Sequence, residues 1–186
     1  MKIAIISDVH DNFHNLICAL EEIEKRDVEY VLCLGDLVAN GVVKILAKLD
    51  IPVFLIWGNN VGDNVQVMKT VFESNGNLVV SEKTYDSIEL DGRKIFLSHY
   101  PDLASPIAKS GDFDAVFFGH THKKSQEKIG NCLVLNPGEI GTNVVDESSF
   151  AVYDTKTNEA EAVVLDDIVT IRTDKVRKYL DENKIF

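Results

Sequence analysis

Short apolar runs alternate with longer amphipathic segments over the first part of the chain. A continuous apolar run is typical of a strand buried on both faces, whereas apolar residues spaced three and four apart indicate one face of a helix. The pattern predicts buried strands over Lys2–Ser7, Tyr30–Gly35 and Val53–Trp57. It predicts helices over Phe13–Arg26, from Asn40 to about Leu49, and after Asp63, where Val65, Met68, Val71 and Phe72 recur with helical spacing. This alternation favours parallel strands joined by right-handed helical crossovers.

The second half of the chain has a different pattern, with shorter and more alternating strands. Asp91-Gly92 separates two strand patterns and predicts a hairpin. The strands predicted here cover Tyr85–Leu90, Lys94–Ser98, Ala115–Phe118, Cys132–Leu135, Phe150–Tyr153 and Ala160–Leu165. Pro101–Ser110 is predicted to be a loop or short helix, and Thr173 or Asp174 to cap a last helix through Leu180. The sheet content is therefore expected to be mixed.

Composition points to one packed domain spanning residues 1–186. The chain is 45% hydrophobic and 26% charged, which is ordinary globular usage. Its apolar runs are far shorter than the roughly 18 residues that span a bilayer, so we expect a cytoplasmic protein without a membrane partner. Cys18, Cys33 and Cys132 lie among apolar neighbours, which indicates buried reduced thiols that serve packing.

The charge balance limits the class of substrate. The formal net charge of -11 would repel a long polyanion, so extended nucleic acid is a poor partner and a nuclease is disfavoured. A small phosphate ester remains compatible, because divalent cations reverse the sign of a site locally.

Five apolar runs end in Gly or Ser and then present a side chain that can bind metal. The endings are Ser7-Asp8-Val9-His10, Gly35-Asp36, Gly58-Asn59, Ser98-His99 and Gly119-His120-Thr121-His122. Ligands gather beyond the carboxyl ends of strands in open α/β sheets, so these side chains are predicted to form one site. Their O and N donors suit Mn, Fe, Zn, Ni or Co, and seven ligands exceed what one tetrahedral ion uses. We therefore predict two divalent ions that share a carboxylate and clamp a phosphoryl group.

The order of these motifs, D-x-H, G-D, G-N, H and G-H-T-H, resembles the calcineurin-like metallophosphoesterases. The short length is similar to that of the small bacterial and archaeal phosphodiesterases of the superfamily. The resemblance implies an α/β fold, a four-layer αββα sandwich of two mixed sheets flanked by helices. It implies that Asp8, His10 and His122 bind one metal, that Asn59, His99 and His120 bind the other, and that Asp36 bridges them.

The function expected from this resemblance is hydrolysis of a small phosphate ester, most simply a diester, by a hydroxide held between the two ions, with Mn favoured. Asp36, Asn59 and His99 are the expected catalytic residues, and Asn12, Asn59 and Asn60 the expected substrate contacts. Asn12 is also a suitable N-cap for the first helix. His14, in the first turn of that helix, is interpreted as a surface or capping-region histidine, with substrate contact as the alternative.

Two positions depart from the family pattern. Larger relatives carry His where this chain has Asn60, and an amide cannot donate a proton to a leaving group. Many bacterial relatives carry Ser where this chain has Glu139, in a turn interpreted as structural. The competing function is that of a scaffold, because one retromer subunit resembles this fold and serves as a platform for partners. Assembly into a homo-oligomer is left open.

Overall fold

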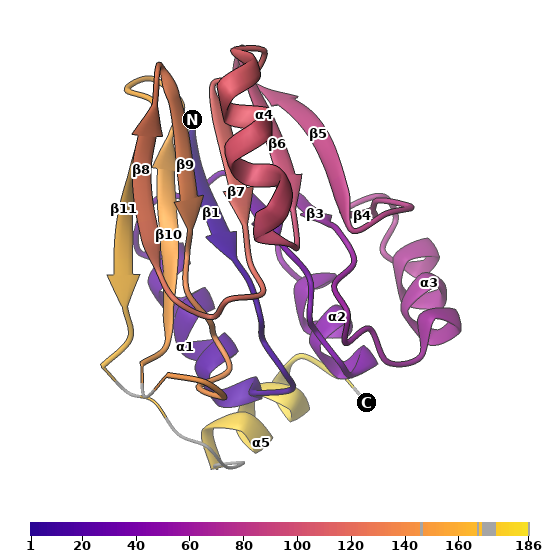
Figure 1. Cartoon of the computed structure of the whole chain (residues 1–186). Coiled ribbons are helices and arrows are strands. Elements are labelled where there is room, and N and C mark those ends of the chain that lie inside the picture. Colours follow the sequence, from indigo (N-terminus) through magenta and orange to yellow (C-terminus); the bar gives the residue numbers. More distant parts are fainter. Residues whose placement is uncertain (146, 167, 169–173, 186) are drawn as a thin grey trace.

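The computed structural model describes residues 1–145, 147–166, 168 and 174–185. It contains two mixed β-sheets that pack face to face (Figure 1). The first sheet has the order β11-β10-β1-β2-β3-β4, with β1 (Lys2–Ile6), β2 (Tyr30–Cys33), β3 (Val53–Leu55), β4 (Leu78–Val80), β10 (Ser149–Asp154) and β11 (Glu159–Val164). Strands β1 to β4 are parallel, and β10 and β11 extend the sheet antiparallel beyond β1.

The second sheet has the order β5-β6-β7-β9-β8. Its strands are β5 (Tyr85–Leu90), β6 (Arg93–Ser98), β7 (Ala115–Phe118), β8 (Ser125–Ile129) and β9 (Cys132–Asn136). Strands β6, β7 and β9 are parallel, while β5 and β8 are antiparallel edges. Asp91 and Gly92 both have positive φ and form the β5–β6 hairpin that the sequence predicts.

Three apolar clusters separate the layers. The central cluster joins the facing sides of the sheets, with residues such as Ile5, Leu34 and Phe117 fully buried. A second cluster lies between the first sheet and the helices α1 (Phe13–Glu24), α2 (Asn40–Leu46), α3 (Asn64–Glu73) and α5 (Asp174–Glu182). A third lies between the other sheet and α4 (Ala104–Ser110), which packs against β7 and β9 on the outer face of that sheet (Figure 1). The predicted αββα sandwich of two mixed sheets is therefore confirmed.

Most predicted helices are found, with small differences at their ends. Asn12 caps α1 by accepting the backbone N–H of Asn15, as predicted, and the helix ends at Glu24 rather than Arg26. Helix α2 ends at Leu46, before the predicted Leu49, and Pro101–Leu103 forms a 3₁₀ turn ahead of α4. Helix α5 includes the predicted segment through Leu180, whereas Thr173 lies outside the described residues.

The apolar stripe predicted for α3 faces the core only in part, through Val71, which packs against the second cluster. Val67 and Thr70 are buried there, whereas Val65 and Phe72 are 76% and 81% exposed. The reason is the phase of the helix, because residues two positions apart lie on nearly opposite sides of a 3.6-residue turn. Strand β8 is absent from the sequence prediction, because its residues are polar and mostly exposed and give no apolar pattern.

Candidate metal centre

The site is built from five loops that follow parallel strands. Asp8 and His10 follow β1, Asp36 follows β2 and Asn59 follows β3 in the first sheet. In the second sheet, His99 follows β6, while His120 and His122 follow β7. Parallel neighbours end at the same edge of a sheet, so stacking the two sheets brings all five loops together.

Backbone strain is concentrated in these loops. Five of the seven predicted ligands have left-handed backbone conformations: Asp8 (φ 53), His10 (φ 46), Asp36 (φ 53), His120 (φ 66) and His122 (φ 62). Such a conformation is unfavourable for residues other than Gly and persists where the surrounding structure imposes it. The sharp turns redirect the chain at the end of each strand and point the side chains to a shared region.

Two glycines allow the loops to approach each other closely. A Cβ on Gly58 would lie 2.0 Å from Asp36 Oδ1, and a Cβ on Gly119 would lie 2.1 Å from Ser7 Oγ. Neither distance is compatible with a carbon atom at that position. The glycines before Asn59 and His120 are therefore required by packing against the neighbouring carboxylate loops.

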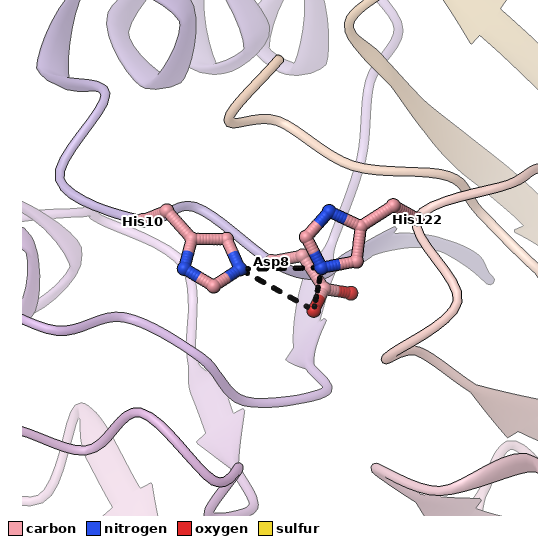
Figure 2. Close-up of side chains that lie close together, drawn as sticks. All are labelled: Asp8, His10 and His122. Carbon is pink, nitrogen blue, oxygen red and sulfur yellow. Dashed lines mark hydrogen bonds and ion pairs between the residues drawn. The ribbon is translucent and has the colours of Figure 1, made fainter. Parts of the chain in front are cut away.

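Asp8, His10 and His122 form the first cluster, in which the three side chains point toward one another (Figure 2). His122 Nε2 lies 3.4 Å from both Asp8 Oδ1 and His10 Nε2. His10 Nε2 is 3.8 Å from Asp8 Oδ1. Asp8 and His122 are buried, and His10 is partly exposed. The donor atoms thus converge on a small volume that remains open on the side of His10.

Asp8, Asp36 and His99 form a second cluster, so Asp8 is common to both. His99 Nε2 lies 3.4 Å from Asp36 Oδ1 and 2.9 Å from Asn59 Oδ1, and its Nδ1 lies 2.8 Å from the carbonyl oxygen of Leu34. The other oxygen of Asp36, Oδ2, is 3.6 Å from His10 Nε2. Asp36 therefore lies between the two clusters.

His120 lies at the exposed rim of the second cluster. Its ring centroid is 5.1 Å from that of His99 and 4.9 Å from that of Tyr100, both at steep interplanar angles. Its backbone N–H donates to Asp8 Oδ2 at 3.0 Å. The His120 loop is thereby fixed to the first cluster while its ring adjoins the second.

Asp8 and His10 each favour the charged form of the other. Burial opposes ionisation of Asp8, but the nearby His10 ring and the Ser7 hydroxyl outweigh it, so the pKa of Asp8 lies below its ordinary value. Burial also opposes protonation of His10, yet Asp8 and Asp36 raise its pKa above the ordinary value. The site accordingly favours a positive charge among its carboxylates.

One atom tests whether a cation fits. Asp8 Oδ1 is fully buried, and within the described part of the chain it has no hydrogen-bond partner. A buried carboxylate oxygen without a partner is costly, and it lies beside the Nε2 atoms of His10 and His122. One carboxylate and two imidazoles are a donor set that first-row divalent ions prefer. The residues present therefore fit a divalent ion.

The two predicted substrate contacts outside the ligand clusters, Asn12 and Asn60, are held by the protein itself. The Asn12 side chain accepts from Asn15 N and donates to the carbonyl oxygen of Gly141 at 3.0 Å. Asn60 donates from its backbone and from its side chain to the two oxygens of Asp36. His14 lies in the first turn of α1, as interpreted, but it is buried with 5% exposure, so the expectation of a surface position is wrong.

Sequence reasoning missed three residues around the clusters. Ser7 donates its hydroxyl to Asp8 Oδ2 at 2.6 Å, and the Tyr100 ring packs against His99 and His120. Glu139 Oε2 lies 2.6 Å from His122 Nδ1. Of the three, only Glu139 could have been found from the sequence, because it stands where many bacterial relatives carry Ser.

The cysteines are not activated for this chemistry. All three are buried and free, as the sequence predicts. Burial raises the pKa of the Cys33 thiol to about 12 and that of Cys132 to about 11, so both remain protonated near neutral pH. Neither is activated as a nucleophile.

The chain is similar to known phosphoesterases. It is 31% identical over 168 residues to the phosphodiesterase MJ0936 of Methanocaldococcus jannaschii, covering 89% of this chain and 100% of that protein. A solved structure of an archaeal phosphodiesterase aligns with a TM-score of 0.82 at 31% identity over 89% of this chain and 100% of the other. The Zn²⁺ complex of Vps29 from Entamoeba histolytica shares the fold, with a TM-score of 0.63 at 20% identity over 88% of this chain and 99% of the other.

Residues 1–158 match the calcineurin-like phosphoesterase superfamily domain. This range contains β1 to β10, together with all five candidate ligand loops, and ends just before β11. The chain belongs to the calcineurin-like phosphoesterase superfamily.

Proposed function

We propose that this phosphoesterase is a phosphodiesterase that hydrolyses a small phosphate ester with the help of two divalent ions. Asp8, His10 and His122 would hold one ion, Asn59, His99 and His120 the other, and Asp36 would contact both. The phosphodiesterase activity named for the 31% identical archaeal relative supports the reaction class. We also propose that residues 1–186 form a single cytoplasmic domain.

The placement of Asp36 is the observation that carries the two-ion proposal. Its Oδ2 faces His10 and its Oδ1 faces His99, at 3.6 and 3.4 Å. A carboxylate that faces two donor clusters can hold two cations at a fixed separation. Its side chain is 1% exposed, so this arrangement is constrained by packing.

Divalent ions at these positions would lower the pKa of a water molecule and offset the negative charge on the phosphoryl oxygens. The protein side chains would contact the phosphoryl group and orient the metal-binding residues. Asn59 is exposed at the rim, where its Oδ1 faces His99 and its amide N–H groups are suited to a phosphoryl oxygen. His99 is oriented by the Leu34 carbonyl, which favours a proton on Nδ1 and leaves the Nε2 lone pair facing Asp36.

Two further asparagines complete the proposed substrate surface. Asn12 and Asn60 remain predicted substrate contacts, and each already donates a hydrogen bond within the protein. An amide at position 60 supplies no proton to the leaving group. We therefore propose that aryl diesters, whose leaving groups need little acid assistance, react faster than alkyl monoesters.

The direct test is a screen of chelator-stripped protein against aryl diesters, alkyl diesters and monoesters, with and without Mn²⁺, Ni²⁺, Co²⁺ or Zn²⁺. Elemental analysis of the same samples gives the ion content. We expect no turnover in the stripped protein and recovery with added metal, Mn²⁺ best. Full diesterase activity in verified metal-free protein would falsify the proposal.

A pair of isosteric variants separates the site from the rest of the surface. Asp36→Asn removes the carboxylate between the clusters and should abolish turnover. Asp50→Asn makes the same charge change at an exposed position after α2 and should leave turnover unchanged. Equal loss in both variants would point to a general effect of net charge.

One observation favours part of the scaffold alternative. Val65 and Phe72 on α3 are exposed and lie outside the ligand clusters, as residues of a partner surface would. The predicted ligand residues are all present, however, and a platform without catalysis has no need for buried carboxylates facing histidines. Hydrolysis is therefore the function we propose. Homo-oligomerisation stays a proposal.

A further inference from the structure

Glu139 is a fully buried carboxylate beside the first cluster. It follows β9 and Gly138, and its side chain is 0% exposed. A buried negative charge is costly unless hydrogen bonds or opposite charges compensate it. The groups that compensate the charge of Glu139 should therefore indicate what the carboxylate does.

Four donors surround the two oxygens of Glu139. Oε1 accepts the backbone N–H groups of Val144 and Val145 at 2.9 and 2.7 Å. Oε2 accepts the backbone N–H of Asn143 at 2.8 Å and lies 2.6 Å from His122 Nδ1. Three of these donors belong to one loop, so the loop is shaped around the carboxylate. The fourth is a member of the first cluster.

The contact with His122 determines which ring nitrogen carries the proton. A carboxylate oxygen accepts a hydrogen bond, so Nδ1 must be the donor at 2.6 Å. The lone pair of a neutral ring is then on Nε2, the atom that lies 3.4 Å from Asp8 Oδ1 and His10 Nε2. The ring is also prevented from rotating away from the cluster.

We infer that Glu139 is a positioning residue, which fixes the tautomer and orientation of His122 for a divalent cation and joins the cluster to the loop from Gly141 to Val145. This inference rests on the proposed function. A carboxylate behind a ligating histidine raises the basicity of the ring, and loss of such a partner typically weakens metal binding by 10- to 100-fold.

The two clusters differ in this respect. His122 has a carboxylate behind it, whereas His99 has the neutral carbonyl of Leu34. Glu139 consequently strengthens the Asp8, His10 and His122 cluster, and its hydrogen bonds within the described part of the chain do not include Asp36 or His99. The inference predicts two ion sites of unequal affinity, of which only one depends on Glu139.

The loop provides the second link to the site. Gly141 donates its N–H to the carbonyl oxygen of Asp8 at 2.9 Å and accepts from Asn12 Nδ2. The next residues supply the three N–H donors to Glu139. The carboxylate thus connects His122 to a loop that also contacts the β1 loop.

The test compares wild type, Glu139→Gln and Glu147→Gln by calorimetric titration of chelator-stripped protein with Mn²⁺. Gln has the same shape, but its amide nitrogen cannot accept a hydrogen bond. Glu147 lies in the same segment and pairs with Lys124 Nζ, so its variant matches the charge change away from His122. We expect Glu139→Gln to weaken one of two sites about 10- to 100-fold and Glu147→Gln to leave both unchanged.

A measurement on the unaltered protein keeps the inference testable if Glu139→Gln does not fold. Nitrogen-15 NMR of metal-free wild type should show His122 with its proton on Nδ1, in a strong hydrogen bond. A His122 ring protonated on Nε2 alone would overturn the inference, as would wild-type ion affinities in a folded Glu139→Gln protein. Failure of wild type to bind any ion would instead contradict the proposed function, while the NMR result would stand separately.

Discussion

Asn60 donates two hydrogen bonds to Asp36, one to each carboxylate oxygen. Its backbone N–H reaches Oδ1 at 2.8 Å and its side-chain amide reaches Oδ2 at 2.8 Å. The residue that differs from the histidine of larger relatives is therefore already engaged in orienting the carboxylate between the two clusters. Position 60 therefore helps to orient Asp36, and an imidazole there would contact that carboxylate differently.

Asn60→Ala should lower kcat/KM about tenfold on aryl and alkyl esters alike. The variant keeps the backbone bond to Asp36 but loses the side-chain bond, and a hydrogen bond to a charged group contributes about 1.5–3 kcal/mol. Steady-state kinetics with both ester classes measure the effect. A loss confined to one class would argue that the amide contacts the leaving group instead.

Asn60→His should raise kcat/KM for alkyl esters more than for nitrophenyl esters, because imidazole can donate the proton that the amide cannot. A well-placed general acid contributes about 10² to 10⁴ in rate, and the pH profile should gain a limb near the histidine pKa of about 6.5. The measurement is kcat/KM as a function of leaving-group pKa, with ion content checked. An unchanged slope at full ion occupancy would remove the proposed acid role.

Asp36→Ala should weaken both ion sites, whereas His10→Ala should spare the second. The expectation follows from the Asp36 oxygens, which face His10 and His99 separately. Ion stoichiometry measured at a series of metal concentrations distinguishes the two variants. If both retain one ion with equal affinity, Asp36 does not serve two sites.

Gly119→Ala should disrupt the site through packing. The added Cβ would lie 2.1 Å from Ser7 Oγ and 2.9 Å from Asp8 Oδ2. We expect loss of ion binding and a lower melting temperature. Gly130→Ala is the control, because Gly130 has φ +61 but open space around its Cβ position, and should cost about 1 kcal/mol in stability without loss of activity. Equal ion binding in both variants would contradict the packing argument.

Asp114→Asn should reduce stability near neutral pH but have little effect in acid. Burial opposes ionisation of Asp114, but the Lys94 N–H and the Arg93 guanidinium, at 2.9 Å each, hold its pKa below the ordinary value. A carboxyl with a lower pKa in the folded state stabilises it above the unfolded pKa of about 3.9, and this contribution is lost as pH falls through the folded pKa.

Melting temperatures measured from pH 7 to pH 2 test whether the stabilisation by Asp114 is lost as the pH falls. The difference between wild type and Asp114→Asn should be a few degrees at pH 7, for about 1 kcal/mol, and should shrink below about pH 4. Asp112→Asn, at an exposed neighbouring position, should follow wild type throughout. A difference that stays constant with pH would show that ionisation of Asp114 contributes nothing.

The sequence predicted the parallel strands and the placement of the candidate ligand loops well, because buried strands give apolar runs and the candidate ligands stand directly after them. Asp36 and His99 could be placed at strand ends from this pattern alone. Strand β8 and the phase of α3 could not, since exposed polar edges and surface apolar residues such as Phe72 do not reveal which side faces the core.

The finer geometry of the site was also beyond the sequence. The contact between Glu139 and His122 joins residues in separate turns, and no local pattern encodes it. The left-handed backbone at Asp8 and His122 is similarly imposed by tertiary structure, because neither residue type favours that conformation as Gly does.

The division of the ligands between the two sheets has a consequence for survival of the protein in a cell. Asp8 and Asp36 follow strands of one sheet, and His99 and His122 follow strands of the other. Bound ions would therefore link the two sheets at the carboxyl ends of their parallel strands. An ion present at 100 times its dissociation constant adds about 2.7 kcal/mol to folding stability. Metal starvation would therefore expose the chain to proteolysis, and cellular abundance, not only turnover, would follow the supply of metal.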